Sequence, residues 1–92
     1  MRDSYKRSLR FIIQHYGRKS QEEIAIEECS ELVKAIIKLR RGKGTVEELV
    51  DELADVQIMT DQLKLIYHCE EEVMARIDDK VSRQLLRMDE GE

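Results

Sequence analysis

Two pairs of carboxylates recur at the same spacing inside the apolar stripes of two predicted helices, Glu28-x-x-Glu31 and Glu52-x-x-Asp55. A helix turns by about 100° per residue, so each pair lies on or beside the apolar face of its own helix. Acids on a packing face are unusual, because burying an unpaired carboxylate costs several kcal/mol. Two solutions exist: some of the carboxyl groups protonate at raised pKa values, or a cation binds among them.

The chemistry of the four carboxylates limits which cation they could hold. Carboxylate oxygens are hard ligands that select Mg²⁺, Mn²⁺ or Ca²⁺. A di-iron centre would bring Glu-x-x-His pairs, and neither His15 nor His68 stands at that spacing from these acids. Mg²⁺ held by carboxylates usually keeps positions open for water and substrate phosphates. Ordinary solvated acids remain the alternative, since a chain with 20 Asp and Glu residues produces such pairs by chance.

A helix hairpin is needed to bring the two pairs together. Gly42-Lys43-Gly44 is the clearest break in the chain, and so short a loop forces its flanking helices to run antiparallel. In antiparallel helices, the residue numbers of two facing positions add up to the same value along the whole hairpin. The numbers of Glu28 and Asp55 have the same sum as those of Glu31 and Glu52. This sum is three less than the loop centre predicts, which corresponds to an axial mismatch of about 4.5 Å between the helices, less than one turn. The two pairs are therefore expected to be level across the hairpin.

The rest of the sequence is helical in pattern. Apolar residues recur at intervals of three and four, which predicts helices over about 3–16, 20–41, 45–67 and 70–88. Ser20 and Thr45 each begin a capping box, with a glutamate three residues later, and Gly17 is expected to end the first helix. The prediction is one all-α domain over residues 1–92, a four-helix bundle-like fold with a central antiparallel hairpin.

Composition excludes several classes of protein. A chain of 92 residues fits one domain, and the absence of Pro and Trp with only four Gly argues against an all-β sandwich. The net charge of −4 argues against binding to nucleic acid or to an anionic membrane. No apolar run approaches the roughly 20 residues of a membrane span, and the first ten residues lack a signal-peptide core. Two cysteines make no disulfide framework, so a cytoplasmic location is expected.

Size and helix length favour self-association. A chain of this size buries only about 60–65% of the surface that its unfolded form exposes. The two central helices are longer than a monomer of 92 residues needs, and their apolar stripes are wide. We therefore expect the fold to be completed by oligomerisation, as a homodimer or a homotetramer.

The acidic segments also resemble a known family. Glu27-Glu28-Cys29-Ser30-Glu31 matches an E-E-x-x-E motif, and Glu52-Leu53-Ala54-Asp55 matches an E-x-x-D motif. In order and separation they resemble those of the MazG-type all-α nucleoside triphosphate pyrophosphohydrolases, a superfamily that includes dimeric dUTPases, dCTP pyrophosphatases and phosphoribosyl-ATP pyrophosphatase. The resemblance covers roughly residues 21–83. It implies hydrolysis of the α–β phosphoanhydride of a (deoxy)nucleoside triphosphate, which yields a monophosphate and pyrophosphate.

The resemblance also implies roles for individual acids. By position, Glu28, Glu31, Glu52 and Asp55 would be catalytic ligands of Mg²⁺, for which Mn²⁺ could substitute. Glu27, the extra acid of the first motif, would hold a second ion or orient the attacking water. Helical geometry points Glu27 about 100° away from Glu28. Mg²⁺ bridging phosphate oxygens would neutralise the charge that the leaving pyrophosphate gains.

Fixed cations are expected to bind the substrate phosphates. Lys80-x-x-Arg83 resembles a K-x-x-R stretch found late in family members, which implies phosphate contact. Lys34 and Lys38 lie one and two turns beyond Glu31 and could serve as well, also from a neighbouring subunit. Asp79 stands where relatives often carry Asn.

Two alternatives to this function stay open. One is a non-catalytic oligomeric helical interaction module, whose acids form salt bridges with Lys34, Lys38 and Arg41. The other is a pyrophosphohydrolase of a different phosphorylated substrate, such as phosphoribosyl-ATP. The first alternative predicts that Mg²⁺ has no effect on stability.

Overall fold

The computed structural model describes residues 1–91 and consists of four helices in sequence. They are α1 (Asp3–Tyr16), α2 (Arg18–Arg40), α3 (Val46–Ile66) and α4 (Glu70–Asp89). The described residues contain no strand. The all-α prediction is confirmed, and each helix begins and ends within two residues of its predicted bounds.

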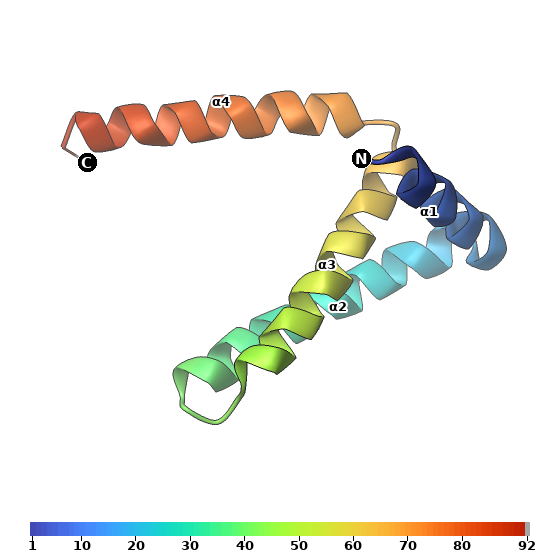
Figure 1. The fold of residues 1–92 in the computed structure, drawn as a ribbon, viewed down its shortest axis with the longest axis horizontal. Helices are drawn as coiled ribbons and strands as arrows, with labels where there is room; N and C mark the ends of the chain where they lie inside the picture. Colours follow the sequence, from blue (N-terminus) through green and yellow to red (C-terminus); the bar gives the residue numbers. More distant parts are fainter. Residues whose placement is uncertain (92) are drawn as a thin grey trace.

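The centre of the fold is an antiparallel hairpin of α2 and α3, which pack against each other over most of their length (Figure 1). Gly42 in the connecting loop has a φ of 73°, a left-handed conformation that glycine adopts without strain. A side chain at Gly44 would lie 3.2 Å from the backbone nitrogen of Leu39. Thr45 caps α3, because its hydroxyl accepts a hydrogen bond from the Glu48 N–H at 3.2 Å. The predicted glycine loop and Thr45 cap are confirmed.

The junction between α1 and α2 differs from the prediction. α2 begins at Arg18, and Ser20 lies inside its first turn, so the Ser20 cap is wrong. Gly17 adopts a φ of 93°, which ends α1 and redirects the chain in a single residue. Its N–H donates to Ile13 O at 2.8 Å, and its carbonyl accepts from Gln21 N at 3.1 Å. One glycine therefore ends α1 and begins α2, and α2 has no side-chain cap among the described residues.

The core is small and includes hydrogen-bonded polar side chains. Its buried members are Leu9, Ala25, Ala35 and Met59 together with Gln21, Asp61 and Gln62. Gln21 Nε2 on α2 donates to Gln62 Oε1 on α3 at 2.8 Å. Asp61 accepts hydrogen bonds from Tyr5 on α1 at 2.8 Å and from Gln57 and Lys64 on its own helix. These bonds fix α1 and α2 against the second half of α3.

The Tyr5–Asp61 hydrogen bond predicts a loss of stability in alkali. Burial, the hydrogen bond to Asp61 and the charge of that carboxylate together raise the pKa of Tyr5 to about 12. A group with a raised folded-state pKa stabilises fully below its unfolded pKa of about 10, and the contribution is lost as pH rises through the folded value. We expect the melting temperature to fall between about pH 10 and 12, and to fall less in Tyr5→Phe.

Circular dichroism melts from pH 8 to 12 measure this difference. Tyr16→Phe is the matched control, because Tyr16 is an exposed tyrosine of the same helix. Tyr5→Phe should be less stable than the wild type at neutral pH, while Tyr16→Phe follows the wild-type profile. Identical alkaline profiles for the wild type and Tyr5→Phe would contradict the assignment.

The last helix, α4, extends away from the hairpin (Figure 1). Among the described helices its backbone comes close only to that of α3, and it has no buried residue. Glu70 in its first turn pairs with Lys6 of α1 at 3.2 Å and with the N-terminal amine at 3.6 Å. One chain therefore supplies four helices and the hairpin but does not close them into a bundle. None of the helices described combines the length and apolar content that a membrane span requires.

Candidate metal centre

Three of the four predicted acids meet across the hairpin. Glu28 of α2 and Glu52 and Asp55 of α3 each place a carboxylate oxygen within 4.8 Å of the other two. We call these three residues the acidic triad. Glu28 and Glu52 are partly buried, whereas Asp55 is exposed. The triad forms because Glu52 and Asp55 lie about one turn apart on α3 and Glu28 is level with them on the opposite helix.

Among residues 1–91, no ion pair with Lys or Arg neutralises the acidic triad. Burial raises the pKa of Glu28, and a hydrogen bond shared with Asp55 raises it further. The nearby charges of Asp55, Glu52 and Glu31 act in the same direction. Glu52 Oε2 is buried and has no hydrogen-bond partner in the described part of the chain. A buried acceptor without a partner is costly, and a bound cation or a proton would relieve that cost.

Glu31 and Glu27 lie outside the acidic triad. Glu31 is exposed one turn further along α2, and its carboxylate accepts from Lys34 Nζ at 3.3 Å. Glu27 is exposed on the same helix. The fourth metal ligand and the role of Glu27 therefore remain predictions.

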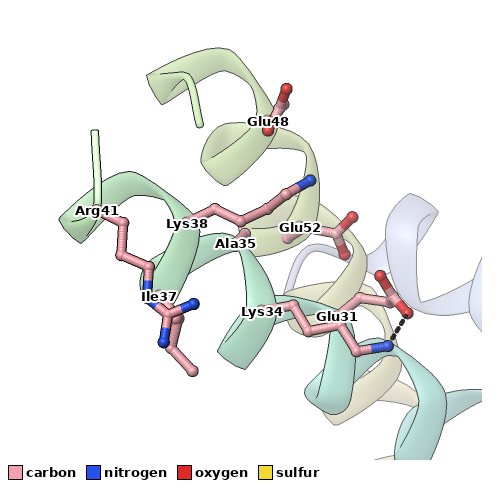
Figure 2. Close-up of a pocket in the computed structure, with 8 residues that line it drawn as sticks. All are labelled: Glu31, Lys34, Ala35, Ile37, Lys38, Arg41, Glu48 and Glu52. Carbon is pink, nitrogen blue, oxygen red and sulfur yellow. Dashed lines mark hydrogen bonds and ion pairs between the residues drawn. The ribbon is translucent and has the colours of Figure 1, made fainter. Parts of the chain in front are cut away.

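A cavity of about 470 Å³ adjoins the acidic triad between α2 and α3 (Figure 2). Its lining residues are Glu31, Lys34, Ala35, Ile37, Lys38, Arg41, Glu48 and Glu52. Glu52 belongs both to this lining and to the triad, so the two features share a side chain. The cavity thus places three cations beside a group of acids, a combination that suits a phosphate and its metal ion.

Two of the three cations of the cavity come from α2, and the third, Arg41, is the residue that caps the end of that helix. Lys34, Lys38 and Arg41 follow at intervals of four and three, so they share a side of the helix. The two lysines were predicted to bind substrate, and the structure places both in the cavity. Arg41, which the sequence suggests only as a salt-bridge partner, lines the cavity as well. Arg41 follows Lys34 by seven residues, about two helical turns, and this spacing is the sequence signal that puts Arg41 on the same side as the two lysines.

The structure does not bring Lys80 and Arg83 to the cavity within one chain. Both residues are exposed on α4, which leaves α3 and has no contact with α2 among the described residues. Lys80 instead lines a separate cavity with Glu72 and Arg76. The departure of α4 follows from the turn after α3, where His68 adopts a φ of 52°. Their phosphate contact stays a prediction, and it requires a second copy of the chain.

The donor set fits a hard divalent cation. Three carboxylate oxygens from two helices can bind one ion and leave further positions for water and phosphate oxygens. The buried Glu52 oxygen without a partner is the kind of atom that such an ion satisfies. In comparisons with protein-family models, curated proteins and solved structures, nothing matches this chain.

Proposed function

We propose that this chain is a Mg²⁺-dependent nucleotide pyrophosphohydrolase with a MazG-like fold. The observation that carries the proposal is the acidic triad beside a cavity with three cations. The E-E-x-x-E and E-x-x-D segments supply the triad, and their resemblance to the family motifs supports the same reaction. The substrate is a (deoxy)nucleoside triphosphate, and the products are its monophosphate and pyrophosphate.

Each group in the proposed site has a separate task. Glu28, Glu52 and Asp55 would hold the metal ion, and Glu31 would join them after its pair with Lys34 breaks. The bound ion would neutralise phosphate charge and lower the pKa of a water molecule. Lys34, Lys38 and Arg41 would bind the triphosphate by charge-assisted hydrogen bonds. Glu27 would orient the attacking water or hold a second ion.

The reaction needs no covalent nucleophile. Water adds to one phosphorus of the α–β anhydride, the bridging P–O bond breaks, and the water proton passes to a nearby carboxylate. Positioning and electrostatic stabilisation supply the catalysis in phosphoanhydride chemistry of this kind. The cavity cations favour the transition state, because negative charge grows on the leaving pyrophosphate.

One rival function has an observation in its favour. Large apolar side chains are exposed on every helix, including Phe11, Val33, Leu53 and Val81, as in a protein that binds other helices. An interaction module would use these faces and leave the acids as surface charges. Hydrolysis of another phosphorylated substrate, such as phosphoribosyl-ATP, is a variant of the proposed function.

The proposal is tested by product analysis. Purified protein is incubated with a panel of NTPs and dNTPs and with phosphoribosyl-ATP, with Mg²⁺ or with EDTA, and the products are separated by chromatography. The proposal predicts monophosphate and pyrophosphate from a triphosphate, only with the metal. Diphosphate and phosphate as products would contradict the bond assignment. No turnover with any substrate, together with no rise in melting temperature on adding Mg²⁺, would favour the interaction module.

A further inference from the structure

A cavity of about 310 Å³ lies at the end of the hairpin away from the loop, where α1 packs against the end of α3 (Figure 1). We call it the α1 cavity. Its lining shares no residue with the acidic triad or with the cavity beside that triad. The proposed function therefore leaves the α1 cavity without a role.

Among residues 1–91, the α1 cavity is lined by basic groups and by no carboxylate. Arg10 of α1, Arg18 of α2 and His68 of the turn after α3 supply the basic side chains, and Gln14 adds an amide. The whole chain carries 20 acids and a net charge of −4, so a lining with two arginines and no acid differs from the average of its surface. A concave site lined by one sign of charge attracts ligands of the opposite sign, which here means an anion.

Arg10 is free to bind such an anion, because it forms no ion pair with any described residue. Lys6, one turn earlier on the same helix, is instead paired with Glu70 at 3.2 Å. Arg10 also borders a neighbouring cavity whose lining includes Glu70, Glu71 and Glu72. Only the α1 cavity combines Arg10 with a lining free of acids, so we expect the anion there rather than in the neighbouring cavity.

Arg18 is held in position by contacts outside the cavity lining. Its guanidinium carbon lies 4.5 Å from the centre of the Tyr67 ring, a cation–π contact. Its Nε donates to Glu22 Oε1 at 3.0 Å, and the Tyr67 hydroxyl donates to the same oxygen at 2.7 Å. The bond to Glu22 uses Nε, so the terminal N–H groups of Arg18 can still bind a ligand. A side chain that is already oriented loses less entropy when a ligand binds.

The rest of the α1 cavity is apolar. Ile13 of α1 and Leu65 and Ile66 of α3 are partly buried and line it with aliphatic surface. Apolar walls with a few convergent polar groups are the usual composition of small-molecule sites, whose volumes begin at about 300 Å³. The lining therefore suits a ligand that has an apolar body as well as a charge.

We propose that the α1 cavity binds a small molecule with one anionic head, a carboxylate or a phosphate monoester, on an apolar body. The head lies between Arg10 and Arg18 and accepts charge-assisted hydrogen bonds from both. The body packs against the aliphatic side chains of Ile13, Leu65 and Ile66. Such a ligand bridges α1, the start of α2 and the end of α3, and it does so at a distance from the acidic triad.

NMR titrations of the ¹⁵N-labelled protein in EDTA test this proposal, with phenyl phosphate, benzoate and inorganic phosphate as probes. The amide signals of Ile13, Leu65 and Ile66 should shift as the preferred probe is added. We expect phenyl phosphate or benzoate to bind with a Kd at least about tenfold lower than that of inorganic phosphate, which has no apolar body to bury. The tighter of the two aromatic probes identifies the head as a phosphate ester or a carboxylate.

Two arginines of α1 provide a matched pair of variants. Arg10→Gln should raise the Kd of the preferred probe at least about tenfold, because a hydrogen bond to a charged group is lost. Arg7 is an exposed arginine of the same helix outside the cavity lining, so Arg7→Gln changes the net charge equally and should keep the Kd within about twofold. Lys38→Ala should also keep this Kd, since Lys38 lines the other cavity. The melting temperature of Arg10→Gln should equal that of the wild type.

Three results would overturn the proposal. The first is the absence of any shift at the α1 cavity with about 10 mM phenyl phosphate or benzoate. The second is equal affinity for inorganic phosphate and both aromatic probes, which would show that the apolar walls contribute nothing. The third is an equal loss of affinity in Arg10→Gln and Arg7→Gln, which would indicate general attraction of anions. The titrations contain no metal ion and no triphosphate, so their outcome is independent of the proposed activity.

Discussion

Replacing Glu52 by glutamine should lower kcat/KM for Mg²⁺-dependent triphosphate hydrolysis by about 100- to 1000-fold, the usual loss when one electrostatic contact to the reacting group is removed. Glu52 belongs both to the acidic triad and to the cavity. Glutamine keeps the size of the side chain but loses the negative charge that would hold the ion. The loss should appear in kcat and in the Mg²⁺ concentration needed for half-maximal rate.

The same substitution should not harm the fold. Glu52 Oε2 has no hydrogen-bond partner, so no structural bond to it is lost, and one repulsive charge near Glu28 disappears. In EDTA the melting temperature of Glu52→Gln should therefore equal or exceed that of the wild type. Asp51→Asn is the matched control, because Asp51 is an exposed neighbour outside the triad. Wild-type turnover in Glu52→Gln would show that this acid does not hold the ion, and failure of the variant to fold would show that the acid is structural.

Replacing Lys38 by alanine should raise KM for the triphosphate by about 10- to 100-fold with a smaller effect on kcat. Lys38 lines the cavity beside Glu52, and a hydrogen bond from a charged group contributes about 1.5–3 kcal/mol. The loss falls mainly on KM, because the phosphates carry charge before the reaction as well as during it. Steady-state kinetics at saturating Mg²⁺ separate the two constants.

Lys43→Ala is the matched control for the Lys38 prediction. Lys43 is an exposed lysine in the loop between α2 and α3 and does not line the cavity. Its removal changes the net charge equally, so a shared effect would indicate long-range attraction of the substrate rather than contact. Unchanged KM in Lys38→Ala would place the phosphates elsewhere, with Lys80 and Arg83 as the next residues to test.

The helices and the hairpin could be predicted because they follow from local rules. Apolar periodicity determines where helices form, and a fixed rise per residue makes Glu28 level with Asp55 once the loop is known. The predicted start of α2 at Ser20 was wrong, because a capping box indicates a helix start only when no stronger signal precedes it. Gly17, with a φ of 93°, is that stronger signal.

The direction of α4 and the buried glutamines could not be predicted. α4 leaves the hairpin after a turn in which His68 has a φ of 52°, a conformation that the sequence does not announce. Gln62 is only 2% exposed, and its burial is tolerated because its side chain accepts a hydrogen bond from Gln21 on the facing helix. Apolar periodicity alone predicts that both glutamines lie on the surface. The carboxylates of Glu28, Glu52 and Asp55 lie close together as expected. Glu31 does not join them, and its carboxylate pairs with Lys34 instead.

The location of the bound metal tests the central claim most directly. Crystals of the protein grown with Mn²⁺ and a triphosphate whose α–β bridge is an imido group would hold the substrate intact. Anomalous diffraction would then locate the ion. We expect a Mn²⁺ peak bonded to carboxylate oxygens of Glu28, Glu52 and Asp55 and to phosphate oxygens of the analogue, with Lys34, Lys38 or Arg41 against the triphosphate. An analogue bound elsewhere, or a triad without an anomalous peak at saturating Mn²⁺, would contradict the proposed function.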